Sequence, residues 1–142
     1  MSVFSQIQHD SEYRFKINVP SNWTKSSRID GTDKVYDFYS PDENAAIQLR
    51  AFNSDERVTL DLLVQLYEQS YLPSGSQRQS IEAHTTVNGI PGKQGVYLAN
   101  YNGIQVAIAV FYTIQKMKGY VLTAIIPTTM LEQKGDEVKN IT

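Results

Sequence analysis

The sequence holds few side chains of the kinds that carry out catalysis. Its two histidines are His9, in a polar opening segment, and His84, on a predicted strand whose apolar residues point the other way. A Ser-His-Asp triad would need His84, a carboxylate and an activated serine, and the sequence has no G-x-S-x-G motif. We expect His84 to face solvent, and we keep a hydrolase of unrecognised type, using His84 and an aspartate, as an alternative. No cysteine occurs, which excludes thiol catalysis, disulfides and cysteine-based metal sites.

Carboxylates gather in one stretch of the chain. Five fall within fourteen residues, namely Asp30, Asp33, Asp37, Asp42 and Glu43. Oxygen ligands suit Ca²⁺ or Mg²⁺, but the spacing does not match an EF-hand loop, and aspartate is also an ordinary turn residue. We therefore expect weak, adventitious cation binding at most, and we assign no metal site and no cofactor.

Aromatic residues lie beside two predicted polar turns, at Asp30 to Asp33 and at Ser40 to Asn44. Tyr36, Phe38 and Tyr39 lie close in sequence to Asp30 and Asp33, and aromatic groups with a polar rim are typical of recognition surfaces. We predict partner contacts at Asp30, Asp33, Tyr36 and Tyr39. Because exposed charges contribute little to folding, we expect charge reversal at Asp30 and Asp33 to weaken partner capture and to leave the melting temperature nearly unchanged.

Composition limits the classes of function. The chain has 142 residues, of which 41% are hydrophobic and 20% charged, with a net charge of −2. This length predicts one domain, and the charge balance argues against nucleic acid as a partner. Residues 1–10 form a polar lead without the features of a signal peptide. The protein is thus cytosolic if Met1 is the native start, or Met1 stands where a targeting segment was removed.

The elements that must position these residues are mostly strands. Alternation of apolar and polar residues predicts strands, and eight segments qualify: 13–19, 25–28, 35–39, 46–52, 81–87, 95–101, 104–115 and 120–126. Short turns make most of them antiparallel neighbours. An apolar stripe at helical spacing predicts a helix over Thr59 to Tyr71, with Thr59 as N-cap and Pro73 beyond its end.

Two strands decide the fold class. The segments 104–115 and 120–126 are apolar on both faces, so they belong in the sheet centre with a layer on each side. Thr129 and Glu132 have the spacing of a capping box, which predicts a second helix from near Met130. The sequence therefore predicts an α+β fold, a three-layer α/β/α sandwich around a mainly antiparallel sheet of about seven strands with two helices. Six residues are predicted to be buried: Trp23, Leu63, Tyr67, Ile108, Val110 and Leu122.

The opening strand carries a resemblance to a known family. The segment YRFKINVPSNW, residues 13–23, resembles the first strand of PsbP-like proteins, in which an aromatic strand is followed by Pro, two residues and Trp. The helix start TLDLL at 59–63, the Asn88-Gly89 turn, the long apolar hairpin and the strand YVLTA at 120–124 agree in order. The resemblance covers residues 11–142, which we treat as a single domain.

The resemblance implies a function as well as a fold. The PsbP-like fold is an α/β/α sandwich shared with the Ran-binding Mog proteins and the DcrB lipoproteins. It implies a non-enzymatic, extracytoplasmic binding or assembly module in the periplasm, in a lumen or on a lipid anchor. We expect a protein partner, no nucleic acid, membrane association only through a removed N-terminal anchor, and a monomer. The alternative within this fold is a cytosolic Mog-like protein that binds a small GTPase.

Overall fold

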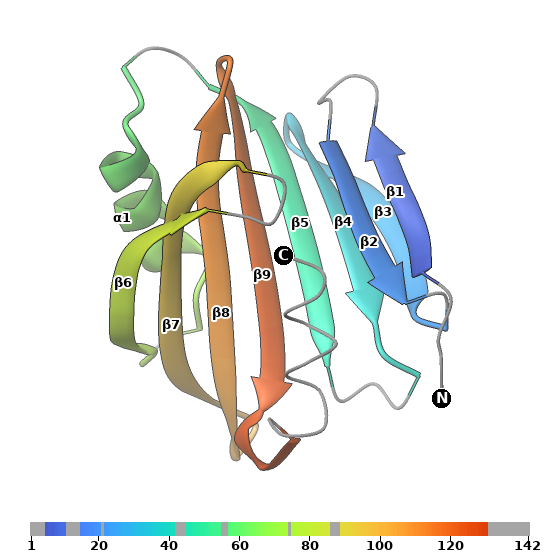
Figure 1. Ribbon diagram of the computed structural model, residues 1–142. Coiled ribbons are helices and arrows are strands. Elements are labelled where there is room, and N and C mark those ends of the chain that lie inside the picture. The colour runs from blue at the N-terminus through green and yellow to red at the C-terminus, as the bar shows by residue number, and fades with distance from the viewer. Residues whose placement is uncertain are drawn as a thin grey trace.

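The computed structural model describes residues 5–10, 15–20, 22–41, 45–54, 57–73, 75–85 and 89–130. It has nine strands and one α-helix among these residues (Figure 1). In chain order they are β1 (Ser5–Asp10), β2 (Phe15–Pro20), β3 (Thr24–Asp30), β4 (Asp33–Tyr39), β5 (Ala46–Asn53), α1 (Leu60–Ser70), β6 (Gln77–Thr85), β7 (Pro91–Tyr101), β8 (Ile104–Gln115) and β9 (Lys118–Pro127). A 3₁₀ turn, Thr128–Met130, follows β9.

Seven of the strands form one antiparallel sheet. Their order is β3-β4-β5-β9-β8-β7-β6, so β9 and β8 lie in the middle. This confirms the prediction that the two segments with apolar residues on both sides occupy the sheet centre. The β7–β8 connection is the two-residue turn Asn102-Gly103, whose positive φ angles of 53° and 83° are those that a tight hairpin requires.

Each face of this sheet has its own apolar core. Beneath α1 the core comprises Leu63, Val64, Tyr67, Tyr97, Ala99, Val106, Ile108, Val110, Tyr112 and Val121. The opposite face has a core of Trp23, Tyr36, Phe38, Ala45, Ile47, Leu49, Ala124 and Ile126. Of the six residues predicted to be buried, five are buried, and Leu122 is half-buried against the second core.

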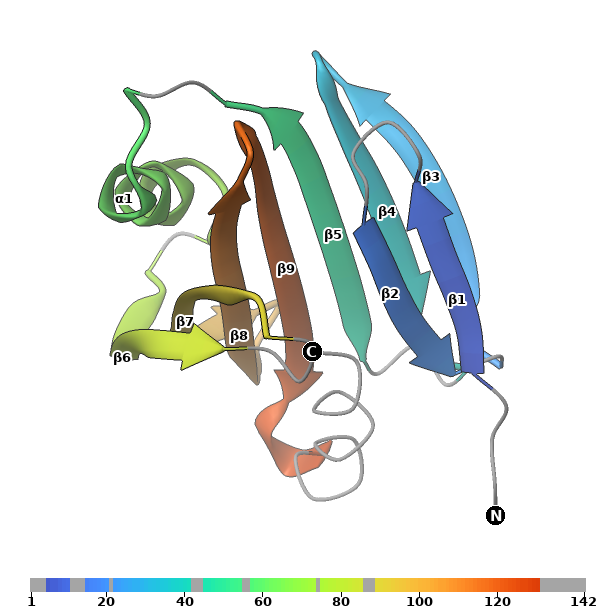
Figure 2. The ribbon, with the colours of Figure 1, turned by 45° about the horizontal axis from the view of Figure 1, so that its top comes forward.

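The N-terminal strand is in a different place from the one we predicted. We expected residues 13–19 to join the main sheet after a polar lead, but β2 pairs only with β1, in a separate two-stranded sheet. Figures 1 and 2 show β1 and β2 in front of β3 and β4, across the main sheet from α1. Alternation along one strand indicates which of its sides is buried, but it does not identify the neighbouring strand.

The predicted helix at 59–71 is confirmed, and it begins where its capping residue stands. The Thr59 hydroxyl accepts a hydrogen bond from the Leu62 N–H at 3.1 Å, which satisfies one of the free donors of the first turn. The described residues contain this one α-helix, not two. The helix predicted from near Met130 falls on residues 131–142, outside the described part, so the second helical layer of the predicted sandwich is not seen. Within the described ranges no helix is long and apolar enough to span a membrane.

Candidate functional site

The face of the sheet that carries α1 is only partly covered by it. Leu63, Val64 and Tyr67 of the helix pack over β7, β8 and β9. Beyond the helix a groove of about 470 Å³ remains open over β4, β5, β9 and the start of β8. We call it the sheet groove, and the side chains that define it are Asp37, Tyr39, Gln48, Ile104, Thr123, Ile125 and Pro127.

Strand register brings these residues together from distant parts of the sequence. Asp37 pairs with Gln48, which in turn pairs with Thr123, so their side chains lie in one row across β4, β5 and β9. Tyr39, Ala46 and Ile125 form the next row in the same way. Sequence reasoning singled out two of the groove residues, Asp37 as a clustered carboxylate and Tyr39 as a partner contact. It missed the others because they lie on strands that are far from β4 along the chain.

The groove has a polar end and an apolar end. At the polar end the Asp37 carboxylate accepts hydrogen bonds from Arg28 Nε at 3.3 Å and from Gln48 Nε2 at 3.0 Å. The Thr123 hydroxyl lies 2.6 Å from the Tyr67 hydroxyl of α1.

At the apolar end two large side chains are left in solvent. Tyr39 is 42% exposed and Ile104 is 56% exposed, and Ile125 and Pro127 are half-buried beside them. An exposed tyrosine and isoleucine at the rim of a concave surface are suited to bury an apolar ligand group.

The four residues predicted to contact a partner do not form one surface. Tyr39 lies in the sheet groove, whereas Tyr36, three positions earlier on β4, points to the opposite face and is buried there. Asp30 and Asp33 lie at the β3–β4 turn and both bind Arg50. The prediction that Tyr36 and Tyr39 belong to one contact surface is therefore wrong, because odd and even positions of a strand face opposite sides. Partner contact by Asp30, Asp33 and Tyr39 stays a prediction.

Arg50 carries a buried positive charge, and Asp30 and Asp33 both form ion pairs with it. Its side chain is 6% exposed, and its two terminal nitrogens donate to Asp33 at 2.8 Å and to Asp30 at 3.0 Å. The guanidinium also lies over the Tyr71 ring, 4.4 Å from its centroid. Burial alone would lower the pKa of Arg50, but the hydrogen bonds to Asp33 and Asp30 outweigh it and raise that pKa above its ordinary value. The sequence predicted a turn at Asp30 to Asp33, but it did not predict that Arg50 binds the two aspartates.

The remaining candidates for chemistry are placed as follows. The His84 ring is half-buried and packs edge-on against Phe111 at 5.5 Å, on the face opposite α1. His9 is in β1, and its side chain lies outside what the structure describes. Of the five clustered carboxylates, three are paired with arginines, and Asp42 and Glu43 fall outside the described residues. The described side chains include no group of three His, Asp or Glu that could hold a metal ion.

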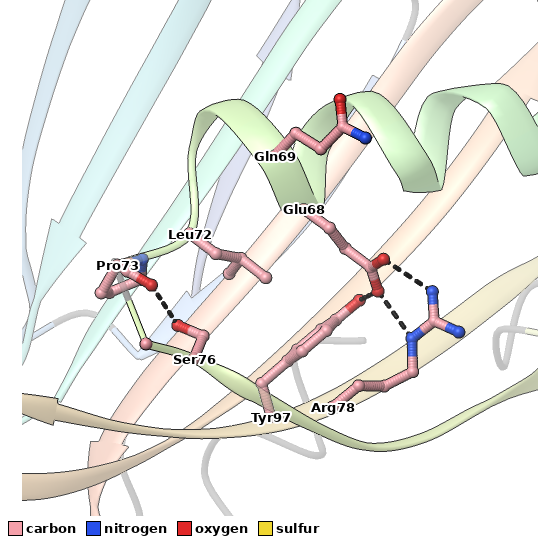
Figure 3. A pocket seen from close by; sticks show the side chains of 8 residues that line it. Glu68, Gln69, Leu72, Pro73, Ser76, Arg78 and Tyr97 are labelled. Carbon is pink, nitrogen blue, oxygen red and sulfur yellow. Dashed lines mark hydrogen bonds and ion pairs between the residues drawn. The ribbon is translucent and has the colours of Figure 1, made fainter.

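A second pocket, of about 360 Å³, lies between the end of α1 and strands β6 and β7 (Figure 3). Glu68 projects from the helix toward Arg78, which donates two hydrogen bonds to the Glu68 carboxylate at 2.6 and 2.7 Å. The same carboxylate accepts a hydrogen bond from the Tyr97 hydroxyl at 2.7 Å. The Tyr97 oxygen is 2.9 Å from the Tyr112 hydroxyl. The two charged side chains in this pocket, Glu68 and Arg78, are therefore paired with each other. The hydrogen bonds of Glu68 connect α1 to strands β6 and β7.

The tyrosines of this network are held neutral. Burial raises the pKa of Tyr97 to about 12. Burial, together with the hydrogen bond that Tyr112 donates to the Tyr97 oxygen, also raises the pKa of Tyr112. Phenols with raised pKa values are poor sources of a proton near neutral pH, so the pair is suited to a structural role.

Comparisons with known proteins identify the fold. No protein-family model and no curated protein matches the sequence. Solved structures match over nearly the whole chain.

Three of these structures are informative. Cyanobacterial PsbP (CyanoP) from Synechocystis sp. PCC 6803 has a TM-score of 0.70 at 11% identity over 99% of this chain and 91% of its own. The Ran-binding protein Mog1p of Saccharomyces cerevisiae has a TM-score of 0.58 at 13% identity, over 99% and 86%. A chain from Bacteroides thetaiotaomicron VPI-5482 has a TM-score of 0.65 at 13% identity, and the present chain covers only 47% of it. The chain therefore has the fold shared by the PsbP-like proteins and Mog1p.

Proposed function

We propose that this chain is a non-catalytic module that binds a protein partner, and that the partner docks in the sheet groove. The observation that carries the proposal is the exposure of Tyr39 and Ile104 at the rim of an open groove on the face that α1 leaves uncovered. Tyrosine is one of the residue types that supply most of the affinity in protein interfaces, and the exposed isoleucine adds apolar surface that a partner can bury.

The arrangement of polar residues supports binding over catalysis. A catalytic centre needs a nucleophile or base with a partner that activates it. In the part of the chain that the structure describes, Asp30, Asp33 and Asp37 are engaged by arginines, and His84 packs on an aromatic ring. If the hydrolase alternative holds, His84→Ala abolishes a hydrolytic activity that the wild-type protein displays.

The comparisons support a protein as the ligand. Mog1p, which shares the fold, is a Ran-binding protein. The resemblance to PsbP-like proteins supports an extracytoplasmic module. A cytosolic protein that binds a small GTPase is the second candidate, favoured by the likeness to Mog1p. The two differ in the identity of the captured partner, because only the second requires a GTPase.

Quantitative capture from the native host tests the proposal. The double variant Tyr39→Ser/Ile104→Ser removes the exposed apolar rim, and we expect at least about tenfold weaker capture of any specific partner, because hot-spot residues contribute about 1–2 kcal/mol each or more. Both side chains are about half exposed, so each change should lower the free energy of unfolding by about 1–2 kcal/mol at most.

Ile29→Ser is the matched control. Ile29 is another exposed isoleucine, 64% accessible, near a strand end. It is adjacent to Arg28, whose side chain reaches Asp37 on the groove face, so Ile29 points to the other face. Partner capture that is lost equally in both variants, or in neither, would contradict docking in the sheet groove.

A further inference from the structure

We infer that the segment of the partner that enters the sheet groove is uncharged and bears aromatic or aliphatic side chains, so that its binding hardly depends on salt. This inference rests on the proposed function. It concerns the chemistry of the partner and not the existence of the site.

The charges that border the groove are already neutralised within the chain. Among the described residues that line it, Asp37 is the one charged side chain. One of its oxygens accepts from Arg28 and the other from Gln48, and its side chain is only 11% exposed. Arg50, in the next position along the same side of β5, is held by Asp30 and Asp33.

An incoming charge would therefore find no partner. A lysine or arginine of the ligand would have to displace Arg28 from Asp37, and a carboxylate would be placed beside Asp37 itself. Either charge would lose its hydration on entering the groove without a full ion pair in return, which is costly. An aromatic or aliphatic side chain loses no such hydration and buries the exposed surfaces of Tyr39, Ile104 and Ile125.

The carbonyl oxygen of Gln48 can orient such a ligand. Gln48 uses its amide nitrogen as a donor to Asp37, which leaves its carbonyl oxygen able to accept a hydrogen bond. A neutral donor, such as an indole or backbone N–H, satisfies that oxygen without bringing a charge. The groove thus favours a neutral peptide segment with large apolar side chains.

Selection from a display library of random peptides of about twelve residues tests this. The library is panned on the intact protein after depletion on the Tyr39→Ser/Ile104→Ser variant. We expect the enriched peptides to be uncharged and rich in aromatic or aliphatic residues. Their Kd should change less than about twofold between roughly 50 and 500 mM NaCl, because screening acts on charge pairs. Enrichment of basic or acidic peptides, or a Kd that rises more than about tenfold over that salt range, would overturn the inference.

A gain of charge recognition provides a second readout. Arg28 is half-exposed, so Arg28→Gln should fold normally and release the Asp37 carboxylate. The same selection on Arg28→Gln should then enrich basic peptides whose binding weakens with salt, and a failure to do so would contradict the role assigned to the Arg28–Asp37 pair. If no peptide distinguishes the groove double variant from the Ile29→Ser control, the proposed function fails as well. If groove-dependent peptides are found but carry charge, the proposed function stands and only this inference fails.

Discussion

Removal of the two carboxylates at the β3–β4 turn should destabilise the fold through Arg50. In the double variant Asp30→Asn/Asp33→Asn the guanidinium of Arg50 stays buried and loses both of its ionic partners. Asparagine keeps the size and turn preference of aspartate, so the change is one of charge. This expectation replaces the one drawn from the sequence, which treated both aspartates as exposed charges without effect on the melting temperature.

The expected magnitude follows from the exposure of each partner. Asp30 is half-exposed, and its loss alone should cost about 0–1 kcal/mol, as for a surface pair. Asp33 is 22% exposed and lies 2.8 Å from the guanidinium, so its loss should cost about 1.5–3 kcal/mol, as for a charged hydrogen bond. Together they leave a buried unpaired charge, for which a loss of about 3–5 kcal/mol is expected. For a chain of this size that lowers the melting temperature by on the order of 10 °C.

Urea unfolding of a double-mutant cycle measures the effect. The matched background is Arg50→Met, which replaces the buried cation with an apolar side chain of similar length. In that background the two Asp→Asn changes should cost less than about 1 kcal/mol, because no charge is left to satisfy. A coupling free energy below about 0.5 kcal/mol would refute the structural role of Asp30 and Asp33. Partner capture by variants of these aspartates is therefore informative only beside a stability measurement.

Three further outcomes are expected. Ile108→Ala should lower the free energy of unfolding by about 2–5 kcal/mol, because Ile108 is fully buried on β8; a loss below about 0.5 kcal/mol in urea titration would place that strand outside the core. Gly92→Ala should also destabilise, since its added methyl would strike the backbone carbonyl of Tyr112, and an unchanged melting temperature would contradict that close approach. The contribution of Tyr97 and Tyr112 to stability should be constant with pH below about 10, the ordinary tyrosine pKa, and should be lost as the pH rises toward about 12. The cause is that the folded pKa values of Tyr97 and Tyr112 are raised, so the unfolded chain loses these protons first. Urea unfolding measured between about pH 10 and 12 should show a smaller loss of unfolding free energy for the double variant Tyr97→Phe/Tyr112→Phe than for the wild type.

The sequence predicts local structure well where one strand or helix carries its own pattern. The apolar stripe and Thr59 locate α1, and the doubly apolar segments locate β8 and β9 at the sheet centre. Pairing between distant strands is not encoded in such patterns, which is why the N-terminal strand was assigned to the wrong sheet. The helix predicted after Met130 lies outside the described residues, so it stays a prediction.

The candidate site was less accessible to sequence reasoning than the fold. Tyr39 was identified because it lies beside polar turns, but Tyr36 was grouped with it although adjacent odd and even positions face opposite sides of a sheet. The groove needs β4, β5, β8 and β9 in register, and only the folded sheet brings Gln48 and Thr123 next to Asp37. The ion pairs of Arg50 with Asp30 and Asp33 were missed for the same reason, since Arg50 lies on β5 and the two aspartates lie at the β3–β4 turn.

Hydrogen exchange of the intact protein, measured with and without the partner that it captures, tests docking in the sheet groove most directly. We predict added protection of backbone amides around Tyr39, in 46–48 and in 123–127, together with the turn at Asn102, since these segments border the groove. The edge strand β6 and the end of β3 around Ile29 should exchange as in the free protein. Protection confined to β6, or to the pocket between α1 and β7, with no change at Tyr39 and in 46–48, would contradict the groove as the binding site.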